Sequence, residues 1–182
     1  QELRKVDITT NSVWYWGFRP WSDPTNLEFQ ATVDRLSTVL VLLSFVVALA
    51  VGWRRWRRDS SYYPWIGVSA AMLCGFLLLH KVHSPQYTLW LLPFFVLLRV
   101  HWGWVVAYLV ADLAMYVGIF RLFYLLNAGL DVGIGGGFAA QAVVIGVWGR
   151  AALLAGLFVV ALRVPTALVG DRLAPATAVR TS

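Results

Sequence analysis

The chain has 182 residues, of which 59% are apolar and only 13% are charged, and its formal net charge is +6. A soluble domain typically carries about 25% charged residues, so the composition excludes an ordinary soluble enzyme. The arginines lie beside apolar runs, where they orient helices in a membrane, and we expect no nucleic-acid partner. The single cysteine, Cys74, lies inside an apolar run and leaves no cysteine-based metal site. We therefore expect no metal and no cofactor.

Residues 1–32 mix charged, aromatic and turn-forming side chains, which predicts an extracytoplasmic, interfacial segment. The chain starts at Gln1, and no signal-peptide pattern precedes the first apolar run, so we expect the native protein to extend further upstream. A transmembrane helix needs roughly 20 predominantly apolar residues to cross about 30 Å of hydrocarbon. Residues 33–162 therefore predict an all-α, polytopic transmembrane helical bundle of about five spans.

The first two predicted spans lie on either side of a basic run. The first span covers Val33–Trp53, and residues 54–58, four of which are arginines, follow directly. Arginines so close to a span place that end in the cytoplasm. The second span runs from Tyr62 to Leu79 and is expected to emerge on the outer face at residues 80–84.

The third apolar run, Tyr87–Val100, is short for a crossing, and Pro93 removes a backbone donor in its middle. Both a kinked span and a re-entrant element fit this pattern. Arg99 and His101 at its end favour a short, kinked crossing back to the cytoplasm, because the alternative would leave the rest of the chain inverted.

The fourth span is predicted at Trp102–Leu126 and the fifth at Phe138–Leu162, with a glycine-rich outer loop between them. Residues 163–182 contain no apolar run long enough to return and are expected to form a cytoplasmic tail. This path collects most of the arginines on the inner face. It predicts a multi-pass protein of the cytoplasmic membrane with its N-terminal segment outside.

Two ionisable residues lie half-way along predicted spans, Asp112 in the fourth and Arg150 in the fifth. A charge at such a position costs roughly 2.5–3.5 kcal/mol on insertion scales, so we expect the two side chains to face the interior and pair. Tyr116 and Gln141 are candidates to complete a polar cluster. A proton or ion pathway uses similar residues, and a transporter or a non-catalytic membrane subunit is therefore the alternative function.

The turn between the second and third predicted spans is rich in polar groups. Lys81 offers a point charge to phosphate, and His83 and Gln86 can hydrogen-bond phosphate or sugar oxygens. A helix that begins near Pro85 adds free N–H groups and a positive dipole end, which together predict an anion site. The alternative is that these side chains reach the membrane interface and that Tyr87 belongs to an aromatic belt.

The string KVHSPQYTLWLLP, residues 81–93, resembles the late transmembrane signature of actinobacterial polytopic glycosyltransferases of the GT-C superfamily. The similarity is strongest to the polyprenyl-phosphate-mannose-dependent mannosyltransferase group. A weaker similarity is seen at residues 10–15, TNSVWY, ahead of the first span. The two matches cover about a tenth of the chain, and their order suits the C-terminal part of such a protein.

The resemblance implies transfer of a sugar, mannose in that group, from a polyprenyl-phosphate donor to a lipid or glycan acceptor on the outer face of the cytoplasmic membrane, as part of building the cell envelope. It implies that the donor phosphate is bound by a set of four residues in the turn, Lys81, His83, Gln86 and Tyr87. In the family the catalytic base is an aspartate in the first outer loop. Asp7, Asp23 and Asp34 do not match its context, so the catalytic residue is unassigned, and we expect the chain to supply donor-binding surface without the base.

Overall fold

The computed structural model describes residues 12–15, 27–58, 62–83, 86–129 and 137–165. Within them the chain forms five helices and no strand: α1 (Leu27–Arg58), α2 (Trp65–Leu79), α3 (Tyr87–Leu97), α4 (Trp102–Asn127) and α5 (Phe138–Ala161). The predicted all-helical bundle is confirmed. The segments expected at 1–32 and 163–182 lie for the most part outside the described residues.

Three of the helices in the described chain are long and apolar enough to cross a membrane, at Ala31–Arg58, Trp102–Leu125 and Phe138–Ala161. These helices indicate a membrane protein. α2 and α3 have 15 and 11 residues, which extend about 22 Å and about 16 Å. Both are shorter than the roughly 30 Å of a hydrocarbon core.

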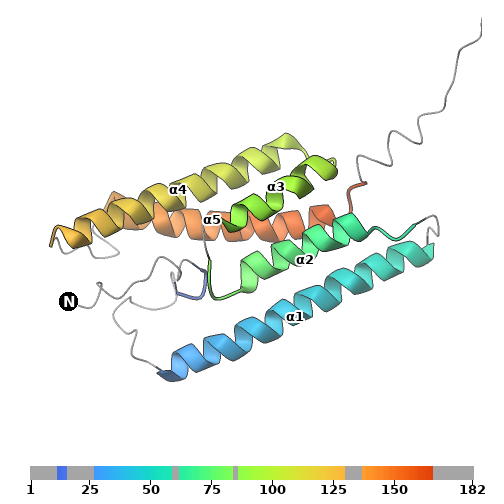
Figure 1. Cartoon of the computed structure of the whole chain (residues 1–182), viewed down its shortest axis with the longest axis horizontal. Coiled ribbons are helices and arrows are strands. Elements are labelled where there is room, and N and C mark those ends of the chain that lie inside the picture. The colour runs from blue at the N-terminus through green and yellow to red at the C-terminus, as the bar shows by residue number, and fades with distance from the viewer. Residues whose placement is uncertain (1–11, 16–26, 59–61, 84–85, 130–136, 166–182) are drawn as a thin grey trace, which may run out of the picture.

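The two short helices form a hairpin whose turn lies near the middle of α5 (Figure 1). Their far ends meet at one end of the bundle, where Ile66 and Leu98 belong to the same buried cluster. α2 and α3 thus form a short hairpin, whose length fits a re-entrant element better than the two separate crossings that the sequence predicted. The chain returns to the side it came from in either case, so the expected sides of α4 and α5 are unchanged.

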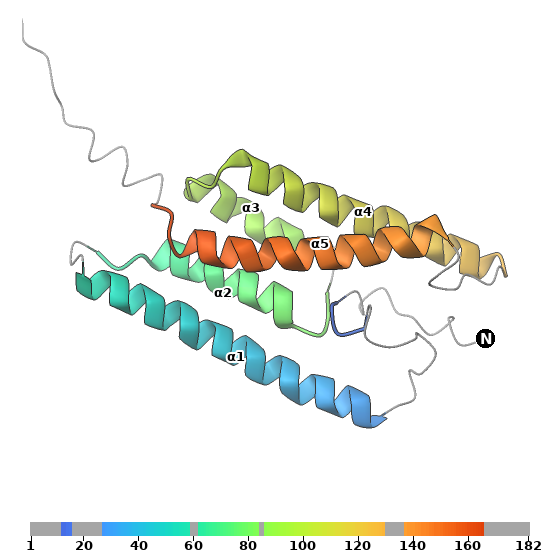
Figure 2. The same cartoon turned by 180° about the vertical axis from the view of Figure 1, so that it is seen from behind.

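α5 lies at the centre of the bundle, between α4 and α2, and α1 packs along the outside of α2 (Figures 1 and 2). The most extensive interface joins α4 and α5. Its buried side chains repeat every three or four residues along each helix, which is the spacing of one helix face. On α4 these are Tyr108, Asp112, Met115, Ile119 and Leu122.

Glycines allow α4 and α5 to approach closely. A Cβ atom on Gly146 would lie 2.6 Å from the backbone nitrogen of Met115, and one on Gly118 would lie 2.8 Å from that of Val143. Small residues at crossings let transmembrane helices pack backbone against backbone. This contact fixes the register of the two helices, and with it the relative depth of their polar residues.

Candidate functional site

An ion pair joins α4 and α5 inside the bundle. Arg150 Nη1 donates to Asp112 Oδ1 at 3.2 Å, and the two side chains are only 4% and 8% exposed. Arg150 is the thirteenth of the 24 residues of α5, and Asp112 is the eleventh of the 26 residues of α4. The structure thus brings together the two charges that were expected to pair, half-way along the long helices. Opposite charges so deep in the bundle offset part of each other's desolvation cost.

The second oxygen of Asp112 binds the hairpin. The Thr88 hydroxyl, in the first turn of α3, donates to Asp112 Oδ2 at 2.8 Å, and the Tyr108 hydroxyl lies 3.5 Å from Thr88 Oγ1. Because a carboxylate only accepts, the Thr88 proton points to Asp112, and Thr88 Oγ1 is left to accept from Tyr108. This chain of donors fixes the N-terminus of α3 against α4.

His83 connects the hairpin turn to α5. Its ring is 1% exposed, and its Nε2 is hydrogen-bonded to Arg150 Nη1. A guanidinium can only donate, so Nε2 accepts and the ring proton resides on Nδ1. Within the described residues Nδ1 has no hydrogen-bond partner, and the same holds for the buried hydroxyl of Tyr116. His83 therefore holds the turn at the depth of Arg150 and does not reach the surface, where it was expected to contact a phosphate.

The remaining predicted residues of the turn lie closer to solvent. The Lys81 ammonium pairs with Asp34 Oδ1 at 2.7 Å, and their side chains are 36% and 48% exposed. Gln86 is exposed and precedes α3, and Tyr87 is half-buried with its ring 5.7 Å from that of His83. Lys81, Gln86 and Tyr87 thus remain available at the tip of the hairpin.

Residues 12–15 cover one side of this tip. The Trp14 indole donates to the Leu79 carbonyl at 2.7 Å, and this carbonyl belongs to the last turn of α2. Burial raises the pKa of the Tyr15 hydroxyl, Asp34 raises it further, and Lys81 lowers it. Tyr15 thus lies near the Lys81–Asp34 pair.

The sequence predicted the charged centre of the network but not all its members. Thr88 and Tyr108 were missed, and so was the separate pairing of Asp34 with Lys81, because these are ordinary helix residues whose partners lie far away along the chain. Gln141 was wrongly grouped with the pair, since its side chain is exposed. It precedes Arg150 by nine residues, which is two and a half helical turns and places it on the opposite face of α5.

Comparisons with known proteins add no family assignment. No family model, curated protein or solved structure matches the chain.

Proposed function

We propose that this protein acts as the membrane part of a glycosyltransferase similar to the GT-C superfamily. It takes a sugar, mannose by resemblance, from a polyprenyl-phosphate donor for transfer to a lipid or glycan acceptor on the outer face of the cytoplasmic membrane. The arginine end of the bundle and the C-terminus face the cytoplasm in this proposal. Its main support is that residues 81–93, which carry the resemblance, include the described part of the turn and the first half of α3, with Lys81 half-exposed and Gln86 exposed at the tip of the hairpin.

The tip has the chemistry to bind a phosphate. An ammonium has three donors, and the Lys81 ammonium directs one of them to Asp34. The first N–H groups of α3 have no acceptor within the helix and carry its positive dipole end. In this proposal Lys81, Gln86 and Tyr87 bind the donor phosphate. His83 is a positioning residue that acts through Arg150.

The test uses the full-length protein in proteoliposomes with polyprenyl-phosphate mannose as donor. Lys81→Gln and Gln86→Ala should each raise the KM for the donor, Lys81→Gln by about tenfold or more, because a hydrogen bond to a charged group contributes about 1.5–3 kcal/mol. Arg121→Gln is the matched control, since Arg121 is an exposed cation on α4 outside the tip. Unchanged KM in both variants would remove the site, and absence of transfer by the unmodified protein would overturn the function.

A second candidate is a transporter, or a membrane subunit without enzymatic activity. The buried Asp112–Arg150–His83 network favours it, because it lies half-way along two long helices beside the ends of two short ones. Ionisable groups and broken helices at this depth are typical of substrate and ion pathways. Uptake into proteoliposomes that depends on pH or on an ion, and that is lost in Asp112→Asn but kept in Asp34→Asn, would favour this candidate over the enzyme.

A further inference from the structure

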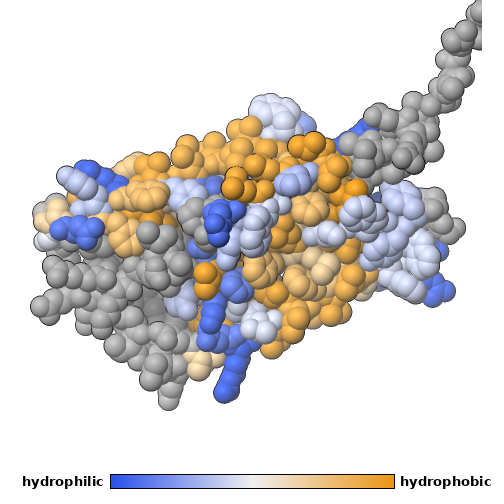
Figure 3. Space-filling model, viewed as in Figure 1, coloured by the Kyte–Doolittle hydropathy of each residue, from blue (hydrophilic) through white to orange (hydrophobic). Residues whose placement is uncertain are grey.

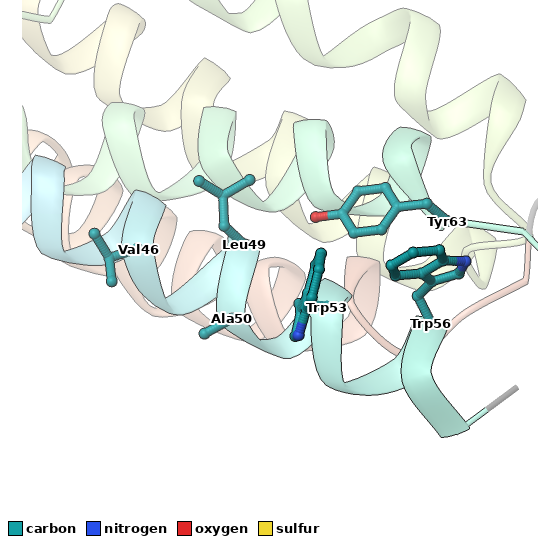
Figure 4. Close-up of a pocket in the computed structure, with 6 residues that line it drawn as sticks. All are labelled: Val46, Leu49, Ala50, Trp53, Trp56 and Tyr63. Atoms are coloured by element: carbon teal, nitrogen blue, oxygen red, sulfur yellow. The ribbon is translucent and has the colours of Figure 1, made fainter. Parts of the chain in front are cut away.

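An apolar groove runs along the surface of α1 near its basic end (Figure 4). Its volume is about 700 Å³, within the range of roughly 300–1,000 Å³ that is typical of small-molecule sites. One wall is the ring of Tyr63, which packs so close to α1 that a Cβ atom on Gly52 would lie 2.8 Å from the Tyr63 hydroxyl. The groove is lined by Val46, Leu49, Ala50, Trp53, Trp56 and Tyr63.

The length of the groove matches one leaflet of a bilayer. The lining residues of α1 run from Val46 to Trp56, and ten residues of helix rise about 15 Å. This is half of the roughly 30 Å of hydrocarbon in a membrane. The groove therefore fits the depth to which a single acyl chain extends from the headgroups to the midplane.

Aromatic rings mark the mouth of the groove. Trp53 and Trp56 pack edge to face with their ring centroids 5.1 Å apart, and they are 52% and 37% exposed. Half-exposed tryptophans are enriched at the level of the lipid headgroups. In Figure 3 the orange surface of α1 gives way to pale and blue side chains toward this end.

Two arginines flank the aromatic mouth of the groove, Arg54 between the two tryptophans along α1 and Arg57 just beyond them. Arg57 follows Trp53 by four residues, and Arg54 follows Ala50 by four, so both lie on the face of α1 that the groove occupies. Both side chains are exposed, and neither takes part in an ion pair or side-chain hydrogen bond among the described residues. Arg55 differs, because it donates to the Leu162 carbonyl and belongs to the contact with the end of α5.

We propose that this groove binds one acyl chain of an anionic diacyl phospholipid from the leaflet at the arginine end, with its phosphate on Arg54 and Arg57. Along α1 the apolar residues of the groove come first, and the two tryptophans and the two arginines follow together, which places the cations at the headgroup end of the acyl chain. Two neighbouring cations with no carboxylate partner in the part of the chain that the structure describes favour a headgroup with net negative charge. The lipid site is separate from the hairpin tip. A negative result for lipid binding in the groove would therefore not bear on the proposed glycosyltransferase function.

The test is native mass spectrometry of the full-length protein in detergent, with dioleoyl phosphatidylglycerol or dioleoyl phosphatidylcholine added. The unmodified protein should retain one phosphatidylglycerol about tenfold more tightly than phosphatidylcholine, because two arginines face the headgroup. Arg54→Gln with Arg57→Gln should remove this preference. Ala50→Phe should fill the groove and weaken retention of both lipids.

The controls are Arg35→Gln and Val39→Phe, which alter exposed positions of α1 outside the groove and should retain phosphatidylglycerol as the unmodified protein does. Circular dichroism should give the same helix content for every variant, since all the substituted positions are exposed. Equal retention of the two lipids, or an unchanged preference in the double arginine variant, would overturn the proposal. Displacement of phosphatidylglycerol by an equal concentration of polyprenyl phosphate would assign the groove to that lipid and would also overturn it.

Discussion

Asp112 is the residue on which the buried polar network converges. Its two oxygens accept from different elements, Oδ1 from Arg150 on α5 and Oδ2 from Thr88 on α3. Replacing a buried pair by apolar residues is often neutral, whereas removing one partner leaves an uncompensated charge. The stability of the bundle should therefore depend on the pair more than on either charge.

Asp112→Ala should lower the free energy of unfolding by about 3–5 kcal/mol, because it leaves the Arg150 guanidinium without its counter-charge. Unfolding of the purified protein in mixed micelles, followed by circular dichroism, measures this. Asp34→Ala is the matched control, since it removes an exposed pair that is worth about 0–1 kcal/mol. Combining Asp112→Leu with Arg150→Met should restore much of the loss, and additive losses would contradict the proposed coupling.

At the residue scale, the sequence predicted the pairing that the cost of burying a charge requires, and it missed the hydrogen bonds between residues far apart along the chain. Asp112 and Arg150 were expected to pair because a lone charge half-way along a span is expensive. Thr88 and His83 were not linked to them, because their partners lie 24 and 67 positions away. Periodicity reports the face of a helix, and it contains no information about which helix packs on that face.

At the scale of single helices, α5 offers two glycines three residues apart with different surroundings. A Cβ atom on Gly146 would meet the backbone of Met115 at 2.6 Å, whereas one on Gly149 would meet only the Ala111 Cβ at 3.7 Å. A Cβ atom at position 146 would therefore force α4 and α5 apart, whereas one at position 149 would make an ordinary van der Waals contact. Alanine substitutions at these two positions therefore distinguish the effect of helix packing on stability from the effect of helix propensity.

Gly146→Ala should destabilise the bundle and Gly149→Ala should not. Alanine favours a helix over glycine by about 1 kcal/mol, so Gly149→Ala should leave the midpoint of thermal unfolding unchanged or raise it. Gly146→Ala gains the same propensity but should lower the midpoint, because overpacking costs roughly 1–3 kcal/mol. Equal midpoints for the two variants would show that the α4–α5 contact tolerates the extra methyl group.

The bounds of α4 and α5 follow closely from the sequence, but those of α1, which begins six residues earlier and ends five residues later than the predicted span, and the path of the short helices do not. α4 and α5 end within one residue of the predicted limits, since apolar runs of about 25 residues leave little freedom. α2 begins three residues later than expected, after Pro64. Length alone left α3 open to a kinked span or a re-entrant element. The contact of His83 with Arg150 favours the re-entrant element, and it joins two segments that no local pattern relates.

At the scale of the whole molecule, the hairpin tip should lie deeper in the bilayer than the end of α4. Arg150, which binds His83, follows the start of α5 at Phe138 by twelve residues, which is about 18 Å. A probe on Gln86→Cys should therefore lie roughly 10 Å or more deeper than one on Ala128→Cys, in a Cys74→Ala background. Quenching by lipids labelled at different acyl positions measures both depths. Equal depths at the headgroup level would make α2 and α3 full crossings.

The hairpin also bears on how the chain is threaded through the bilayer. α2 starts and α3 finishes at the same end of the bundle (Figure 1). The pair therefore returns the chain to the side of the membrane from which it came. Among the described residues, the three long helices α1, α4 and α5 are the candidate membrane crossings, and the hairpin does not change the side on which each of them begins. Excising residues 62–101 would join α1 to α4 on one side without turning any later helix inside out, whereas losing α1 would invert everything downstream.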